Sequence, residues 1–185
     1  GIGRDYTAFT FSDPKTMRTV ATMRTNTADT DAVCEITEHI MKNLFVKTIG
    51  VIERNSLGVI LINYLLKNKL EHRLFYLVKE REAEKVVGKI TVRRKSMVRV
   101  YGVDTTAESR ELMFRHLFQI VSERPSLITC AQIQDEIRTL HRKKNGKIEH
   151  RPGFHDDQLM SWLIAVYADR HEQPVLQSLL AKVNS

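Results

Sequence analysis

The chain has 185 residues, of which 42% are hydrophobic and 28% charged, a composition typical of a globular domain and far from that of a disordered chain. Lys and Arg number 29 against 22 Asp and Glu, so the formal net charge is +7, which favours a polyanionic partner. The sequence has no apolar run near the ~20 residues of a membrane-spanning helix, no secretory signal, and only two cysteines, which excludes a disulfide framework.

Alternating β-branched and aromatic residues open the chain around a turn at Asp13-Pro14, which predicts an N-terminal β-hairpin. Two helices follow, with Thr30 or Asp31 placed to cap the first and Asn55 or Ser56 the second. The second helix is apolar nearly all round, which is typical of a helix buried on most sides. The elements predicted in this half are strands at 6–12 and 17–25, a helix at 30–44, a strand at 47–53 and a helix at 57–68.

In the second half, apolar residues that alternate with Lys and Arg predict a basic hairpin or ribbon over 85–101. Pro125 ends the helix that follows, and Asn145-Gly146 is a strong hairpin signal. The other elements predicted here are a strand at 73–78, helices at 105–123, 156–169 and 173–182, and a helix or strand that leads to 140.

Strands followed by alternating strands and helices are typical of an α/β domain on a mixed sheet flanked by helices. The opening hairpin supplies the antiparallel part of this sheet, and the strand at 47–53, between two helices, supplies the parallel part. The length is that of one domain, so we expect residues 1–185 to form a single folded unit.

Glu53 directly follows the apolar strand at 47–53 and therefore lies at the carboxyl end of that strand. In open α/β sheets, ligands bind at this edge. The alternative is a glutamate that only leaves the sheet for solvent, or that pairs with the neighbouring Arg54.

Two adjacent acids, Asp156 and Asp157, begin the helix predicted at 156–169. Their spacing from Met160 places both near the helix edge that meets the sheet, with Asp157 slightly favoured to face it. Asp is a favoured residue at a helix N-terminus, where it caps the helix and complements the helix dipole. Two acids in succession exceed what a cap requires, so a functional role and a capping role both stay open.

Two clusters of basic residues provide candidate contacts to phosphate groups. They include Lys89, Arg93, Arg94 and Arg99 in the predicted ribbon, and Arg142, Lys143 and Lys144 farther along the chain. The alternation of the ribbon puts Lys89, Arg93 and Arg99 on one face, which could lie across duplex DNA. Solvated surface is the alternative interpretation of both clusters.

Carboxylates at a strand end and a helix start, beside basic ribbons, suit a divalent cation and a nucleic-acid phosphate. Mg²⁺ takes oxygen ligands and is typically held by few carboxylates together with substrate phosphate. Two such ions about 4 Å apart stabilise the attacking and leaving oxygens in phosphodiester hydrolysis. The sequence therefore predicts a site for Mg²⁺ or Mn²⁺, with two ions.

Three stretches resemble motifs of one family, the C-terminal nuclease domain of the large terminase subunit of tailed bacteriophages. GIGRDYTA (1–8) resembles the Gly-rich first turn of that family, VIERNSLG (51–58) its second acidic motif, and GFHDDQLMS (153–161) its third. The order and spacing of the motifs fit the family, and together they span nearly the whole chain.

The resemblance implies a ribonuclease H-like fold and metal-dependent endonuclease cleavage of double-stranded, concatemeric viral DNA. It implies that Glu53 is one metal ligand and that Asp156 or Asp157 supplies another, with Asp5 as a weaker candidate. His155 and Asn55 are expected beside these ligands. Cleavage is expected to show little sequence preference, because contacts to the DNA backbone carry no base information.

In the family, the first catalytic Asp ends a strand that precedes the Gly-rich turn, whereas this sequence starts inside the turn. The resemblance therefore implies that the functional polypeptide extends upstream, with that strand and an ATPase domain. The implied partners are double-stranded DNA, that ATPase domain, the portal and the small terminase subunit, with no membrane. The implied location is the host bacterial cytoplasm and, transiently, the procapsid portal.

Two other functions stay open. A non-catalytic DNA-binding or docking module would keep the ribonuclease H-like fold without its chemistry, which the absence of the first Asp favours. A related nuclease of the resolvase or integrase type is the other alternative, and it would prefer branched or terminal-repeat DNA to plain duplex.

Overall fold

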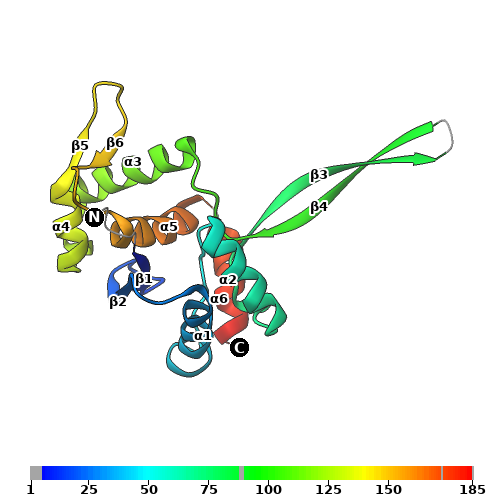
Figure 1. The fold of residues 1–185 in the computed structure, drawn as a ribbon, viewed down its shortest axis with the longest axis horizontal. Helices are drawn as coiled ribbons and strands as arrows, with labels where there is room; N and C mark the ends of the chain where they lie inside the picture. The colour runs from blue at the N-terminus through cyan, green and yellow to red at the C-terminus, as the bar shows by residue number, and fades with distance from the viewer. Residues whose placement is uncertain (1–5, 88–89, 172, 185) are drawn as a thin grey trace.

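The computed structural model describes residues 6–87, 90–171 and 173–184, and for 83–87, 90–94 and 184 it describes the backbone alone. Asp5 and Lys89, both predicted to take part in the site, lie outside the described residues. The described chain combines helices and strands (Figure 1). The helices are α1 (Thr30–His39), α2 (Ser56–Lys67), α3 (Ala107–Glu123), α4 (Ala131–Thr139), α5 (Asp157–His171) and α6 (Gln173–Asn184). The strands are β1 (Thr7–Ser12), β2 (Thr19–Thr25), β3 (Tyr76–Val87), β4 (Ile90–Tyr101), β5 (Leu140–Arg142) and β6 (Ile148–His150).

Within the described residues, the strands form three separate antiparallel pairs, β1–β2, β3–β4 and β5–β6. The mixture of helices and strands agrees with the predicted α/β class. The predicted mixed sheet does not form as one continuous sheet in this part of the chain. Its parallel component is reduced to two isolated bridges, which join Gly50 to Leu74 and Glu53 to Val103.

The segment predicted as a buried strand at 47–53 pairs briefly with two neighbours. The Gly50 carbonyl accepts a hydrogen bond from the Phe75 N–H (2.9 Å), and the Ile52 carbonyl accepts one from the Val103 N–H (2.8 Å). Each neighbour contributes too few residues for a regular ladder, so the segment forms bridges rather than a strand. The bridges nevertheless place Glu53 beside the end of β4.

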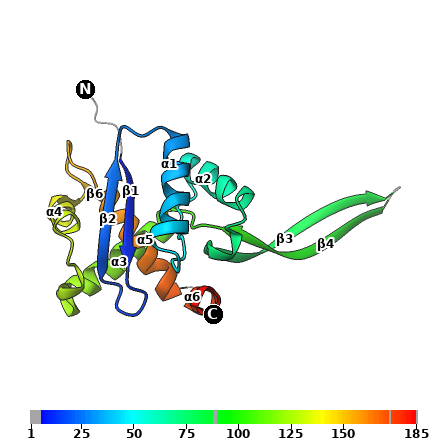
Figure 2. The same cartoon turned by 90° about the horizontal axis from the view of Figure 1, so that it is seen from below.

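The main hydrophobic core surrounds α5, which contacts β1, α3, α4 and α6 (Figures 1 and 2). Leu159, Trp162 and Leu163 of α5 are fully buried, and the Trp162 indole N–H donates to the Met17 carbonyl (3.0 Å). A second cluster, which includes Cys34 and Leu65, lies between α1 and α2. Asp156 and Asp157 therefore stand at the start of the most buried helix of the protein's described part.

Helix α1 begins at residue 30, as predicted, and ends at His39. Its cap is Asp29, which accepts from the Ala32 N–H (2.8 Å), so the predicted cap at Thr30 or Asp31 is wrong. Beyond α1, the chain continues as a π-helical turn, Ile40–Leu44. The second predicted cap is confirmed at Asn55, whose side chain accepts from the Gly58 N–H (2.7 Å).

The predicted ribbon is longer than expected. Strands β3 and β4 pair over twelve positions from Tyr76–Tyr101 to Val87–Ile90, so the second half of the strand predicted at 73–78 is the start of this hairpin. Arg73 is not in a strand, because it ends a short 3₁₀ helix, Glu71–Arg73. The hairpin extends away from the rest of the molecule as a long arm (Figures 1 and 2).

Several other predictions are confirmed, including the N-terminal hairpin, the hairpin turn at Gly146 and the two C-terminal helices. Helix α2 is less buried than predicted, since Ile60 is half exposed. No helix in the described part of the chain is long and apolar enough to cross a membrane.

Candidate functional site

Glu53 lies just before α2, and the Asn55 side chain is hydrogen-bonded both to Glu53 and to the first turn of the helix. The Asn55 amide N–H₂ donates to the Glu53 carboxylate (3.1 Å), while its amide oxygen caps α2. Gly58 allows the helix to approach closely, because a Cβ at this position would lie 1.7 Å from the Glu53 carbonyl oxygen. The segment from Glu53 to Gly58 thus orients the Glu53 carboxylate, caps α2 and sets the distance between α2 and the Glu53 backbone.

Asp156 and Asp157 have different surroundings at the start of α5. Asp156 forms an ion pair with Arg110 of α3 (2.5 Å) and is mostly buried. Asp157 accepts a hydrogen bond from the Tyr6 N–H, just before β1 (3.2 Å), and lies 3.4 Å from the His155 Nδ1. Asp157 therefore faces the start of β1, whereas Asp156 is held by α3.

A third carboxylate at this end of α5 was not predicted. Glu136 of α4 is buried, and it accepts a hydrogen bond from the Leu159 N–H in the first turn of α5 (2.7 Å). The pKa of Glu136 is raised to about 7, chiefly by burial and also by the nearby charges of Asp157 and Asp156, while the hydrogen bond from Leu159 opposes the shift. The amphipathic pattern of α4, in which Glu136 falls between the inward-facing Ile133 and Ile137, is the sequence signal that could have found it.

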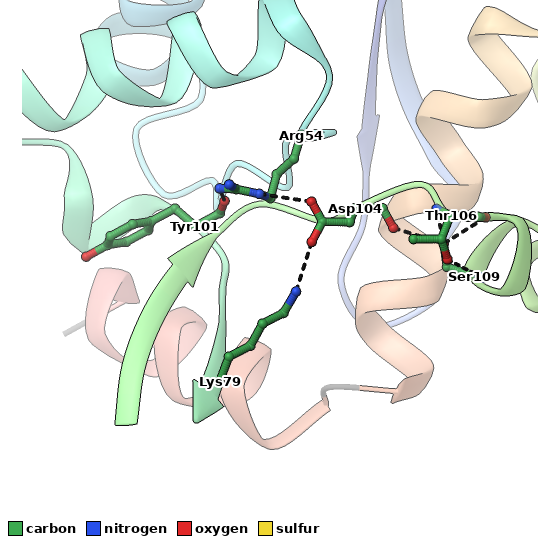
Figure 3. A network of polar contacts seen from close by, with 6 residues as sticks. All are labelled: Arg54, Lys79, Tyr101, Asp104, Thr106 and Ser109. Atoms are coloured by element: carbon green, nitrogen blue, oxygen red, sulfur yellow. Dashed lines mark hydrogen bonds and ion pairs between the residues drawn. The ribbon is translucent and has the colours of Figure 1, made fainter. Parts of the chain in front are cut away.

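A further carboxylate, that of Asp104, lies near Glu53, just after the end of β4. Figure 3 shows Arg54 and Lys79 converging on Asp104 from opposite sides. The Arg54 Nε and the Lys79 Nζ contact its two oxygens at 3.0 and 2.9 Å, and the Arg54 Nη1 also donates to the Tyr101 carbonyl. The hydrogen bond from Lys79 and the charges of both partners lower the pKa of Asp104. The sequence left open an ion pair between Arg54 and Glu53. In the structure, Arg54 pairs with Asp104 instead.

A cavity of about 840 Å³ lies between β1 and the segment 47–53, with α1 and α5 also lining it. Its walls are largely apolar, and its polar residues include Glu53, Asn55, Arg110, Asp156 and Asp157. The structure therefore brings the predicted acids, which are far apart in the sequence, to a single cavity.

The backbone around this cavity resembles an incomplete sheet. Hydrogen bonds join Gly50, Ile52 and Arg54 to their neighbours on one side of the segment. In extended chains, the backbone groups of alternate residues point to opposite sides, so those of Val51 and Glu53 face the β1 side. Among the described residues, no backbone hydrogen bond joins that side to β1.

Carboxylate oxygens are suitable ligands for a divalent cation, but the described carboxylates do not make up a full set of protein ligands. Among the described residues, no group of three or more His, Cys, Asp or Glu side chains is placed to hold a metal ion. Mg²⁺ is usually bound by one or two carboxylates together with waters and substrate phosphates. Glu53 and Asp157 both line the cavity, where Asp157 also contacts the Tyr6 N–H and His155, and Asp156 is engaged by Arg110.

The predicted basic residues fall on two hairpins. In the arm, the Arg99 guanidinium lies over the Tyr76 ring (4.8 Å), and only the backbone is described for Arg93 and Arg94. On the shorter β5–β6 hairpin, Arg142, Lys143 and Lys144 are exposed. Lys143 forms an ion pair with Glu149, and hydrogen bonds from Lys143 and Lys147 lower the pKa of Glu149 to about 2. The positive charge of this second cluster is therefore partly neutralised by its own hairpin.

Comparisons of the chain with models of known protein families, with characterised proteins and with solved structures find no match.

Proposed function

We propose that this chain is the metal-dependent endonuclease domain of a viral DNA-packaging terminase, which cleaves double-stranded concatemeric DNA. The observation that carries the proposal is the common cavity lined by Glu53 and Asp157, since these acids come from two separate motifs of the sequence. The net charge of +7 supports a polyanionic substrate. In this proposal the fold is ribonuclease H-like.

Glu53 and Asp157 would hold Mg²⁺ or Mn²⁺, with two ions as the expected number, and the remaining ligands would include the scissile phosphate. A divalent cation at this position supplies positive charge that stabilises the charge developing on the phosphate. Asn55 keeps the Glu53 carboxylate at the cavity through its hydrogen bond. Arg110 holds Asp156, so we assign Asp156 a supporting role rather than that of a direct ligand.

The cavity also supports the expectation that a further strand completes the sheet. Two segments, β1 and 47–53, flank a largely apolar space, and among the described residues no backbone hydrogen bond reaches their facing sides. An additional strand there would pair with both segments and reach the neighbourhood of Glu53 and Asp157. In the proposed terminase, that strand carries the first catalytic Asp and is preceded by an ATPase domain. The portal and the small subunit are the proposed assembly partners, at the procapsid in the host cytoplasm.

The test is cleavage of supercoiled plasmid in Mn²⁺ by a polypeptide extended upstream to include the additional strand. We expect the extended chain to cut and its Glu53→Gln variant to lose at least 100-fold in rate, because removal of one catalytic charge costs several kcal/mol. Glu71→Gln, at an exposed glutamate, is the control and should cut normally. Equal cutting by the Glu53→Gln variant, or no cutting by either chain, would contradict the proposal.

A second candidate function is a non-catalytic DNA-binding module. The ion pair between Asp156 and Arg110 favours it, because it neutralises one of the acids that a nuclease would use. Such a module would bind duplex equally in Mg²⁺ and in EDTA and would not cut under either condition, with an affinity that falls steeply with salt.

A further inference from the structure

The β3–β4 arm lacks an obvious structural reason for its length. Its strands pair with each other over twelve positions, and no other described element packs extensively on either strand. A lone two-stranded hairpin is at best marginally stable in water. An arm of this kind is more readily explained by a partner that lies along it than by a contribution to the core.

The pairing register divides the arm into two faces, because directly paired residues in antiparallel strands lie on the same face. We define the basic face by these positions: Leu77, Lys79, Arg81, Ala83, Lys85 and Val87 on β3, and Ile90, Val92, Arg94, Ser96, Val98 and Val100 on β4. The mixed face comprises the alternate positions: Tyr76, Val78, Glu80, Glu82, Glu84 and Val86 on β3, and Thr91, Arg93, Lys95, Met97, Arg99 and Tyr101 on β4.

The two faces differ sharply in charge. The basic face holds four basic residues and no acidic one, whereas the mixed face holds three of each. On the mixed face, Lys95 contacts Glu80 (2.7 Å) and Glu82 (3.5 Å), and Arg99 lies over the Tyr76 ring. The cations of the mixed face that have described side chains are thus engaged within the hairpin.

The basic face begins at the candidate site. Lys79, its first cation, contacts Asp104, which also binds Arg54, the residue after Glu53 (Figure 3). A polyanion that lies along Arg81 and farther out on this face would therefore lead toward the Glu53 end of the cavity.

We propose that the β3–β4 arm binds duplex DNA through its basic face, and not through the mixed face that contains Arg93 and Arg99. This inference rests on the proposed function and names the surface that holds its substrate. Twelve residues per strand give an arm about 40 Å long at ~3.3 Å per residue. This length is close to one turn of B-DNA, roughly 34–36 Å. The major groove, about 12 Å wide, admits a two-stranded ribbon.

The test compares two triple variants with the same change in charge. Arg81→Gln/Lys85→Gln/Arg94→Gln neutralises the basic face, and Arg93→Gln/Lys95→Gln/Arg99→Gln neutralises the same number of cations on the mixed face. Affinity for a 30-base-pair duplex is measured by fluorescence anisotropy in EDTA over a series of salt concentrations. Circular dichroism verifies that both variants are folded.

We expect the basic-face variant to lose at least tenfold in affinity and to reduce the slope of log K against log salt by about 2 to 3, because each phosphate contact contributes about 0.9. The mixed-face variant should lose less than threefold. Equal losses would show that only net charge matters, and a larger loss in the mixed-face variant would favour the opposite face. Unchanged DNA binding in both variants would indicate another partner for the arm, such as an acidic protein. Each of these three results would overturn the proposal.

Failure of this inference is distinguishable from failure of the proposed function. The anisotropy measurement contains no divalent cation and therefore does not depend on cleavage. Glu71→Gln, at an exposed glutamate outside the basic face, serves as the reference and should leave this DNA affinity unchanged.

Discussion

Arg73 connects the end of the α1 region to the segment that leads to Glu53. Its side chain is 6% exposed, and its guanidinium donates to the carbonyls of Met41 (2.5 Å), Phe45 (2.6 Å) and Thr48 (3.1 Å). Burial lowers its pKa. The sequence could not predict this role, because the partners are backbone carbonyls, which every residue carries, rather than acidic side chains.

Replacing Arg73 with Met should lower the free energy of unfolding by about 3 kcal/mol, since three backbone carbonyls, that of Met41 buried and the other two part-buried, lose their donor. The measurement is urea denaturation followed by circular dichroism. Arg138→Met is the control, because Arg138 is exposed and pairs with Asp135 on the surface, where a loss below about 0.5 kcal/mol is expected. Similar losses in the two variants would contradict the role given to Arg73.

Because the pKa of Glu136 is raised, we expect the stability of the protein to fall as the pH rises. Its folded-state pKa of about 7 lies above the ordinary value of 4.5, so the folded state keeps a proton that the unfolded state releases in this range. Stability contributed by this group is therefore full below about pH 4.5 and is lost as the pH rises to about 7. Arg24, 3.8 Å away, is the described cation near it, and Asp156 and Asp157 are the acids.

The variant Glu136→Gln should remove this dependence, because glutamine does not titrate but still accepts the hydrogen bond from Leu159. The unfolding free energy of the variant minus that of the wild type should increase by on the order of 2 kcal/mol from pH 5 to pH 8. The measurement is urea denaturation across this range in EDTA. Glu149→Gln is the control, because the pKa of Glu149 is lowered to about 2 and it stays ionised throughout. A constant difference between Glu136→Gln and the wild type would contradict the prediction.

Among the secondary-structure elements, α2 does most to position Glu53. The sequence allowed its start to be predicted, because Asn55 is a favoured cap, and the cap is observed. The sequence did not reveal the close approach at Gly58, since that distance depends on where the preceding segment folds back. It also overestimated the burial of α2, because an apolar helix can still expose residues such as Ile60 at the molecular surface.

Gly58→Ala should destabilise the protein by about 2 kcal/mol, although alanine favours helices by about 1 kcal/mol over glycine. The new Cβ would lie 1.7 Å from the Glu53 carbonyl oxygen, so α2 must move away from the site. Thermal unfolding measures the change, with Val59→Ala on the partly exposed side of the same helix as the control. A Gly58→Ala variant as stable as the wild type would show that α2 does not lie so close to the Glu53 carbonyl.

For the β3–β4 hairpin, the alternation of apolar and basic residues predicted the element but not which residues share each face. The pattern correctly predicted a basic hairpin, and Arg93 and Arg99 do share a face in the observed register. Alternation along one strand did not reveal which residues of the other strand join that face. The register places Glu80, Glu82 and Glu84 there, so the face expected to bind DNA is the one whose charges balance.

For the whole molecule, the sequence predicted the mixture of helices and strands and most element positions, because local patterns determine these. It did not predict that the expected mixed sheet would divide into separate pairs, since sheet continuity depends on which segments meet across the cavity. The motifs that made Glu53 and Asp157 candidate site residues are local in sequence. The sequence did not indicate Asp104 or Glu136, because only tertiary packing brings Asp104 to Arg54 and Glu136 to the first turn of α5.

The central claim is that Glu53 and Asp157 share a divalent cation in the presence of DNA. The most direct measurement is Mn²⁺ binding, followed by electron paramagnetic resonance of the free ion, to the upstream-extended polypeptide with a duplex whose backbone cannot be hydrolysed. We expect Glu53→Gln and Asp157→Asn each to weaken Mn²⁺ binding at least tenfold, and Glu71→Gln to bind as the wild type does. Wild-type affinity in either the Glu53→Gln or the Asp157→Asn variant would contradict the account.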